Sequence, residues 1–143
     1  MVELSAKSEY ALLALLALAR CYRTGELLQI KEIATRQGIP DRYLEQVLAS
    51  LRRAGLVQSQ RGAKGGYSLG KPPWAITVQD VLLVIEGEEV SKRRPLVSVE
   101  QAVLYRVWEQ AQEAATAVFR NHSLQDLADD YEQRSQTQFM YYI

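Results

Sequence analysis

DRYLEQVLASLRRAGLVQSQRGAKGGYSL, residues 41–69, predicts the architecture of the N-terminal half of the chain. In its first part, Leu44, Val47, Leu48 and Leu51 follow the i, i+3, i+4, i+7 spacing of an amphipathic helix, which we expect from Asp41 to Ala54. In its second part, the short runs 57–61 and 67–69 flank a glycine-rich segment, a pattern typical of a β-hairpin. The stretch therefore predicts a helix followed by a hairpin.

The residues before this stretch complete a three-helix unit. Ser8 to Tyr22 is rich in Leu and Ala and contains no Gly or Pro, so we expect a helix that is apolar nearly all round and lies in the core. Ile33 and Ala34 mark one face of a short helix that Gly38 can end in a left-handed conformation, and Pro40 opens the next helix. Three helices with a tight turn before the third, followed by a hairpin, form a winged helix-turn-helix.

The residues after the hairpin predict further helices. Thr77-Val-Gln-Asp80 has the spacing of a capping box, and Gly87 ends the helix that it starts. The longest periodic segment runs from Ser98 to about Asn121, and Ser123 caps a short acidic helix that ends near Gln133. We expect a mainly α fold with a small β-hairpin, divided into a winged helix-turn-helix domain (1–87), a linker (88–97), dimerisation helices (98–134) and a C-terminal tail (135–143).

The long predicted helix carries an apolar face along its whole length. A helix of this kind can cover the core of its own domain, but its length and alanine-rich stripe also suit packing against the same helix of a second copy. We favour the homodimer. The predicted contact residues are Leu104, Val107, Trp108, Ala111, Ala115 and Val118.

Composition sets the general class of the protein. With 48% hydrophobic and 24% charged residues among 143, the chain has the balance of a folded globular protein. Its longest apolar stretch, Ala11 to Ala19, is too short to cross a bilayer, and the first residues lack a signal-peptide pattern, so we expect a cytoplasmic protein without a membrane partner.

A single cysteine, Cys21, limits the chemistry that the chain can support. It cannot form an internal disulfide, and by itself it cannot supply the ligands of a zinc or iron–sulfur centre. We therefore expect no metal and no cofactor. Cys21 itself is either a buried structural thiol or a redox-sensing thiol.

The net charge of zero conceals two oppositely charged halves. Residues 1–75 contain eleven Lys and Arg against six Asp and Glu, whereas residues 76–143 contain six against eleven. A basic half suggests a polyanionic partner, although chance scatter of surface charge is the alternative.

The third predicted helix carries residue types that recognise bases. Its apolar face leaves Arg42, Tyr43, Glu45, Gln46 and Arg53 on or near the opposite side. Arg matches the two acceptors of guanine, Gln pairs with adenine, and Glu accepts from the cytosine amino group. The second helix of a helix-turn-helix enters the major groove, so these residues are predicted to bind double-stranded DNA, with a merely solvated face as the alternative.

The predicted hairpin tip adds two cations on a flexible backbone. Arg61 is the candidate for insertion into a groove, and Lys64 for a phosphate contact. A nucleotide-binding phosphate loop is disfavoured, because that motif leads into a helix and here a strand follows. Lys7, Arg36 and Arg52 are further candidates for phosphate contacts.

Several motifs together resemble one family of regulators. They are Leu4-Ser-Ala-Lys-Ser-Glu-Tyr-Ala11, Ile33-Ala34, Gly38-Ile39, Tyr43-Leu-Glu-Gln46, Leu51-Arg-Arg-Ala-Gly-Leu-Val57, Arg61-Gly-x-Lys-Gly-Gly-Tyr-x-Leu69, Ile76-Thr-Val-x-Asp80 and Glu86-Gly87. The chain is similar to the IscR, NsrR and CymR transcription regulators over nearly its whole length. This resemblance implies a dimeric winged helix in which the positions of Arg42, Gln46 and Arg61 face the bases or grooves of DNA.

The chain departs from the cluster-binding members of that family. Those members carry three cysteines between the helix that ends near Gly87 and the long dimerisation helix, and the segment from Glu88 to Val99 has none here. The resemblance therefore does not extend to an iron–sulfur cluster, although an iron–sulfur or redox sensor with other ligands remains an alternative.

The last residues are similar to the C-terminus of the CymR members, which repress cysteine metabolism and act with O-acetylserine thiol-lyase. The resemblance implies a repressor of sulfur or cysteine metabolism genes and a partner-binding tail of Phe139, Met140, Tyr141, Tyr142 and Ile143. A polar spacer that ends in aromatics and an isoleucine carboxylate suits a pocket lined by backbone amides. The alternative for the tail is that the aromatics fold back on the dimer. The alternative for the function is an interaction module, in which the winged helix is a scaffold and the C-terminal peptide regulates the thiol-lyase. The only histidine, His122, lacks a nucleophile that the sequence pairs with it, so we expect no enzyme.

Overall fold

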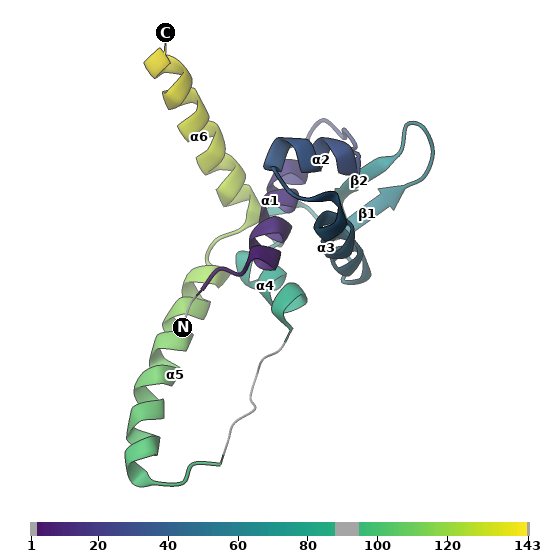
Figure 1. Ribbon diagram of the computed structural model, residues 1–143. Coiled ribbons are helices and arrows are strands. Elements are labelled where there is room, and N and C mark those ends of the chain that lie inside the picture. The colour runs from purple at the N-terminus through teal and green to yellow at the C-terminus, as the bar shows by residue number, and fades with distance from the viewer. Residues whose placement is uncertain (1–2, 88–94, 143) are drawn as a thin grey trace.

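The computed structural model describes residues 3–87 and 95–142, and Figure 1 shows their arrangement. The described elements follow the order α1 (Ala6–Arg20), α2 (Ile30–Gln37), α3 (Asp41–Arg53), β1 (Val57–Gln60), β2 (Gly66–Leu69), the 3-10 turn η1 (Pro73–Ala75), α4 (Val78–Glu86), α5 (Val99–Arg120) and α6 (Leu124–Tyr142). The predicted mainly α fold with one hairpin is confirmed.

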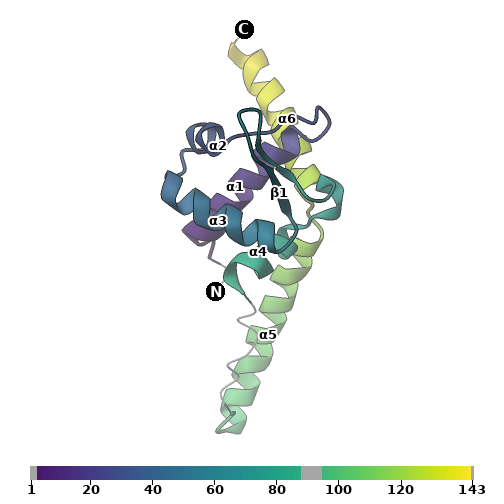
Figure 2. The same cartoon turned by 90° about the vertical axis from the view of Figure 1, so that its right-hand side faces the viewer.

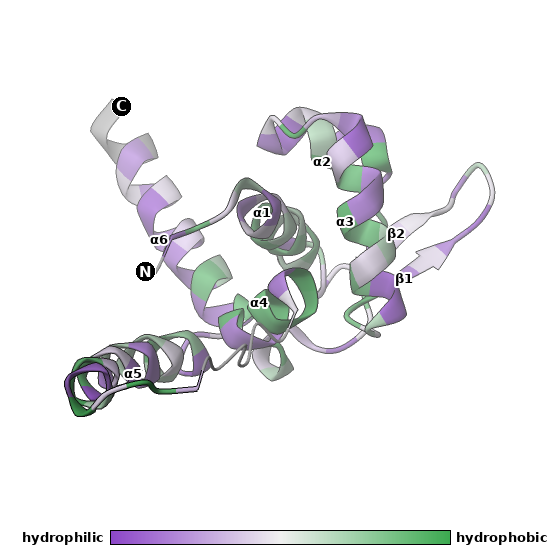
Figure 3. Ribbon diagram, turned by 60° about the horizontal axis from the view of Figure 1, so that its bottom comes forward, coloured by the Kyte–Doolittle hydropathy of each residue, from purple (hydrophilic) through white to green (hydrophobic). Residues whose placement is uncertain are grey.

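Helix α1 forms the centre of the core, as predicted. Ala14 and Leu15 are fully buried, and α2, α3, α4 and α6 surround the helix in Figure 3. It begins at Ala6, two residues earlier than expected, because the Ser5 hydroxyl accepts a hydrogen bond from the Ser8 backbone N–H at 3.1 Å and caps the first turn. Burial of its Ala and Leu side chains stabilises the domain by the hydrophobic effect.

The helix-turn-helix is built from α2 and α3. Gly38 has a φ of 64°, so α2 ends in the left-handed conformation that glycine adopts without strain. The Ile39 N–H then donates to the Ala34 carbonyl at 3.1 Å, and α3 starts after Pro40. Leu44 is fully buried and fixes which face of α3 turns inward.

The hairpin is antiparallel, and a third segment pairs with the outer edge of β2. Val57 pairs with Leu69, and Gln60 pairs with Gly66. Leu28, in the loop before α2, makes two backbone hydrogen bonds with Tyr67, at 2.7 and 3.1 Å. These bonds attach the hairpin to the helix-turn-helix, so the wing has a defined direction relative to α3.

A backbone junction fixes where α5 ends and α6 begins. The Val78 N–H donates to the His122 carbonyl and the Leu124 N–H donates to the Ile76 carbonyl, both at 2.8 Å. Because the Leu124 side chain is also fully buried, the corner between α5 and α6 is anchored beside the start of α4.

Helix α6 differs from two expectations. It continues to Tyr142 instead of ending near Gln133, so the backbone is helical where a C-terminal tail was expected from residue 135. Its interior has no Gly or Pro, and contacts one turn apart, such as the ion pair of Arg134 with Asp130 at 3.0 Å, suit a continuous helix. Its beginning belongs to the core of the winged helix through the buried side chains of Leu124 and Ala128.

Two predicted segments lie outside the described residues. They are most of the linker, at 88–94, and the partner-binding end of the tail, for which the side chains of 139–142 and the whole of Ile143 are not described. No helix of the described residues is long and apolar enough to span a membrane.

Helix α5 stands apart from the rest of the chain. Figures 1 and 2 show it extending away from the winged helix, with only its C-terminal end beside the other helices. None of its residues is buried in the single chain. Its predicted apolar stripe is therefore largely exposed to solvent.

Candidate nucleic-acid interface

The exposed face of α3 carries the side chains that the sequence predicts to recognise bases. The apolar residues Leu44, Val47, Leu48 and Leu51 are fully buried. This leaves a polar outer face, whose members are all exposed: Arg42, Tyr43, Glu45, Gln46, Arg52 and Arg53. The helical periodicity thus separates the two faces as predicted.

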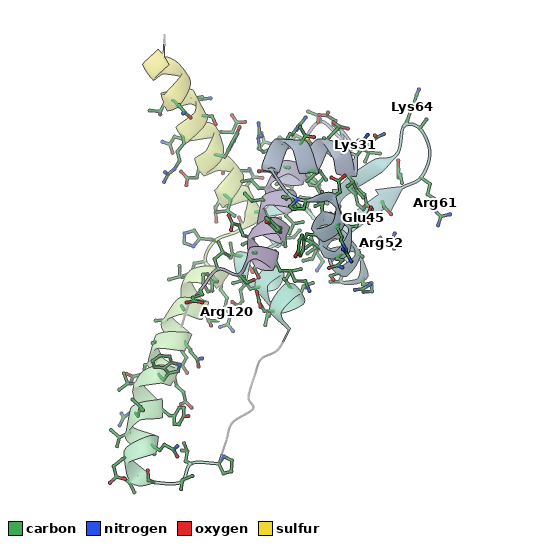
Figure 4. The ribbon with its side chains drawn as sticks, in the orientation of Figure 1. Lys31, Glu45, Arg52, Arg61, Lys64 and Arg120 are labelled. Atoms are coloured by element: carbon green, nitrogen blue, oxygen red, sulfur yellow. The ribbon has the colours of Figure 1, made fainter. Side chains whose placement is uncertain are left out.

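Helix α3 and the hairpin tip present their polar groups on one side of the molecule. In Figure 4, Glu45 and Arg52 on α3 lie on the same side as Arg61 and Lys64 at the tip, whereas Arg120 lies on the opposite side. We call the exposed residues of α3, together with Arg61 and Lys64, the recognition surface. The structure places the cations of the hairpin tip on the same side as the exposed residues of α3, although the two groups are separate in the sequence.

The hairpin tip requires glycine at a position of close backbone approach. A Cβ at Gly65 would lie 2.2 Å from the Gln60 carbonyl oxygen, which is far inside contact distance. The Gly65 N–H donates to the Gly62 carbonyl at 2.9 Å and closes the tip. The tight turn leaves the two cations, Arg61 and Lys64, exposed on its outer side.

Arg52 connects the helix to the hairpin. Its Nη1 donates to the Ser59 hydroxyl of β1 at 3.4 Å, while the neighbouring Arg53 donates to Ser50 on its own helix at 3.3 Å. A guanidinium has five N–H donors, so this contact leaves Arg52 able to bind a phosphate as well. Its position between α3 and β1 is a feature that spacing in the sequence does not indicate.

Helix α2 adds a cation that sequence reasoning missed. Lys31 lies on the same side as the hairpin tip in Figure 4, and with Thr35 and the predicted Arg36 it borders a shallow surface depression. Lys7, the remaining predicted cation, is exposed in the first turn of α1.

Cys21 is buried at the end of α1. Its thiol donates a hydrogen bond to the Glu26 carboxylate at 3.7 Å. Burial raises the pKa of Cys21 above its ordinary value, and the negative charge of Glu26 raises it further. Both effects keep the thiol protonated, which favours a structural thiol over a reactive one.

Glu86 forms a contact that no sequence motif indicates. Its carboxylate, at the end of α4, accepts hydrogen bonds from the hydroxyls of Ser5 and Ser8, the latter at 2.6 Å. These bonds, that from Ser5 first, lower the pKa of Glu86 below its ordinary value. The contact ties the start of α1 to the end of α4, where the linker begins.

Comparison with known proteins identifies the family. The pattern of the Rrf2 family, described as iron-dependent transcriptional regulators, matches residues 4–130. The chain belongs to the Rrf2 family. It is 37% identical over 142 residues to the transcriptional regulator CymR of Bacillus subtilis, which covers 99% of this chain and 100% of CymR.

Solved structures of the Rrf2 family have the same fold. The structure of CymR, the global cysteine regulator of B. subtilis, matches with a TM-score of 0.79 at 36% identity, and the match covers 90% of this chain and 98% of the CymR chain. IscR of T. potens also matches with a TM-score of 0.79 at 36% identity, covering 93% and 90%. The chain is accordingly a DNA-binding transcriptional regulator with a winged helix.

The iron dependence in the family description does not fit the donors of this chain. Among the side chains that the structure describes, no group of three or more His, Cys, Asp or Glu is placed to hold a metal ion. The sequence has one cysteine, Cys21, and it is buried against Glu26. An iron–sulfur cluster needs several thiolates, so the residues do not fit a thiolate-held cluster.

Proposed function

We propose that the protein is a homodimeric, sequence-specific repressor whose two recognition surfaces bind the half-sites of one operator. The observation that carries this proposal is α5. It is a helix of 22 residues in the family of DNA-binding regulators, and it buries none of its residues within its own chain. A second copy supplies the surface that covers it.

The apolar stripe of α5 argues for a copy of the same helix as the partner. Leu104 and Val107 are each 62% exposed and Trp108 is 48% exposed, although these side chains are among those that water exposure disfavours most. Burying each such side chain is worth roughly 1.5–3 kcal/mol. A two-fold axis lets one stripe meet its own copy, which is the commonest way for a soluble protein to form a dimer.

The recognition surface supports sequence-specific binding. Arg42 and Gln46 lie exposed near the start of α3, the part of a recognition helix that approaches base edges, and are assigned to guanine and adenine. Arg61 is assigned to the minor groove, and Lys7, Arg36 and Lys64 to phosphates. In a dimer, the two copies of α3 meet half-sites about one helical turn apart, so the operator is expected to be palindromic.

Control of sulfur or cysteine metabolism genes is the regulatory role that we assign. Support comes from the likeness to CymR, which extends over nearly the whole of both chains, including the C-terminal residues. A wing and recognition helix alone would not favour one regulated pathway over another.

The C-terminal residues Phe139 to Ile143 are assigned to a protein partner, O-acetylserine thiol-lyase. Helix α6 runs as far as Tyr142 in a direction away from the hairpin and from α5, as Figures 1 and 2 show. An end held away from the DNA-binding side can reach a second protein while the operator is bound. Deleting residues 141–143 should abolish capture of the purified thiol-lyase and leave DNA binding unchanged.

The dimer is tested by a matched pair of variants on α5. Ala111 and Ala117 are both exposed, but only Ala111 lies on the apolar stripe, whereas Ala117 lies on another side of the helix. Ala111→Asp buries a charge in the proposed interface and should give a monomer in analytical ultracentrifugation. Ala117→Asp should remain a dimer like the wild type. Equal masses for the two variants would contradict the assignment of this interface.

Sequence-specific binding is tested by selection from a pool of random duplexes. The wild-type dimer should enrich a palindromic site, and binding to it should survive an excess of unrelated duplex. No enrichment at low salt would refute the proposal.

A further inference from the structure

Two tyrosines meet where α1 passes the start of the recognition helix. Tyr10 of α1 is partly buried and packs against the core, while Tyr43, the third residue of α3, is 54% exposed. Their ring centroids are 6.0 Å apart, with an angle of 49° between the ring planes. Tyr43 thus lies beside another aromatic ring and is still largely exposed to solvent, within the first turn of the helix.

The pair restricts the orientation of Tyr43. Aromatic rings at centroid separations of about 4.5–7 Å attract each other in tilted and edge-to-face arrangements. Tyr10 is held by the core, so it offers a fixed surface against which the more exposed ring of Tyr43 rests. An aromatic ring that is already oriented loses little conformational freedom on binding.

The neighbours of Tyr43 on the outer face are charged or polar. Arg42, Glu45 and Gln46 can each hydrogen-bond to base edges, whereas the ring of Tyr43 is the large apolar group among them. In the major groove, the apolar feature that distinguishes one base from the others is the C5-methyl group of thymine. The ring of Tyr43 can therefore contact the thymine methyl group, which the polar side chains of its neighbours are not suited to recognise.

We propose that Tyr43 determines specificity for thymine by contacting its C5-methyl group, and that Tyr10 is the positioning residue that holds the Tyr43 ring. This inference rests on the proposed recognition surface and names one base that it recognises. Tyr43 also carries a hydroxyl, which in a phosphate contact would add affinity without any preference for thymine.

The test compares thymine with deoxyuridine, which differs by that methyl group alone. A duplex selected by the wild-type dimer is remade with each thymine of one half-site replaced in turn by deoxyuridine. At one position we expect binding to weaken about four-fold, the factor for exposing one buried methyl group. Tyr43→Ala should bind the thymine duplex and the deoxyuridine duplex equally. Tyr43→Phe, which keeps the ring and loses the hydroxyl, should still prefer the thymine duplex.

Tyr10 is tested by the ratio of the affinities for the thymine duplex and the deoxyuridine duplex. A smaller folded fraction lowers both affinities alike and leaves this ratio unchanged. Tyr10→Leu should reduce the thymine preference towards one, and Tyr10→Phe should keep it, with thermal melting reporting the folded fraction. Tyr22→Leu is the matched control. Tyr22 follows the other end of α1 and pairs with Trp74 at 5.7 Å, so its loss should leave the preference intact.

The outcomes separate this inference from the proposed function. If the wild type selects a site but no deoxyuridine weakens binding, or if Tyr43→Phe loses the preference as fully as Tyr43→Ala, the thymine contact is refuted. If Tyr10→Leu retains the whole preference, its positioning role is refuted. If the wild type selects no site, the recognition surface itself is wrong.

Discussion

Lys64→Ala gives a sharp test of the wing as a phosphate-binding element. Lys64 is exposed at the hairpin tip and lies on the side of α3 in Figure 4. Each phosphate contact changes the slope of log K against log salt concentration by about 0.9 for duplex DNA. One lysine in each of the two wings of a dimer therefore accounts for a slope of about 1.8.

This slope predicts how the variant compares with the wild type. Between about 50 and about 200 mM salt, the ratio of wild-type to variant affinity should fall by about 12-fold. The assay is fluorescence anisotropy with the selected duplex and with an unrelated duplex at several salt concentrations. Because phosphates carry no sequence information, both duplexes should be affected alike.

Arg134→Ala is the matched control for the loss of one positive charge. Arg134 lies on α6, which points away from the hairpin in Figure 1, and its exposed ion pair with Asp130 contributes little to stability. Its slope should equal that of the wild type. An unchanged slope for Lys64→Ala, or an equal decrease for Arg134→Ala, would refute the phosphate contact of the wing.

Three further substitutions and one labelling experiment test other parts of the structure. Gln46→Ala should weaken specific binding by about 1–3 kcal/mol and relax the base preference at one position, as binding to a library of single-base variants will show. Leu124→Ala opens a cavity at the junction of α5 and α6 and should lower the free energy of unfolding by about 2–5 kcal/mol in urea titrations. The serine hydroxyls lower the pKa of Glu86 below its ordinary 4.5, so their hydrogen bonds stabilise the folded state fully above that pH. This stabilisation is lost as the pH falls through the lowered pKa. Urea titrations at several pH values should show a smaller loss of folding free energy in acid for Glu86→Gln than for the wild type. Because burial raises the pKa of Cys21, iodoacetamide should label the native thiol far more slowly than the urea-unfolded chain at pH 8, and equal rates would favour the redox alternative.

Local chemistry made most of the secondary structure predictable. The capping box at Thr77 and Asp80 forms as its spacing predicts, with reciprocal hydrogen bonds of 2.9 and 3.1 Å. Helix α5 begins directly after Ser98, where the predicted periodic segment starts. Gly38 and Gly87 end their helices with positive φ. Such signals act within one turn of the chain, so they are visible in sequence.

The residue at which α6 ends was not predicted correctly from the sequence. The polar residues from Ser135 onwards suggested an extended tail, but polar composition does not stop a helix that lacks Gly and Pro. Helix α6 has many acidic residues, and the negative charge of the C-terminal half does not indicate that the helix begins in the core. Its side chains Leu124 and Ala128 are nevertheless buried beside α1. Burial of these two residues depends on the backbone junction with Ile76 and Val78, which are far away in sequence.

The amino-acid sequence alone determined the helix faces, the glycine turns, the base-recognising side chains and the lack of cysteine ligands, because periodicity and residue chemistry are local properties. Contacts between distant segments were decided by the tertiary structure: Tyr10 against Tyr43, Arg52 on Ser59, the two serine hydroxyls on Glu86, and an α5 left without cover. These depend on how the helices pack around α1, and packing is set by the whole core at once, so no single stretch of sequence specifies it.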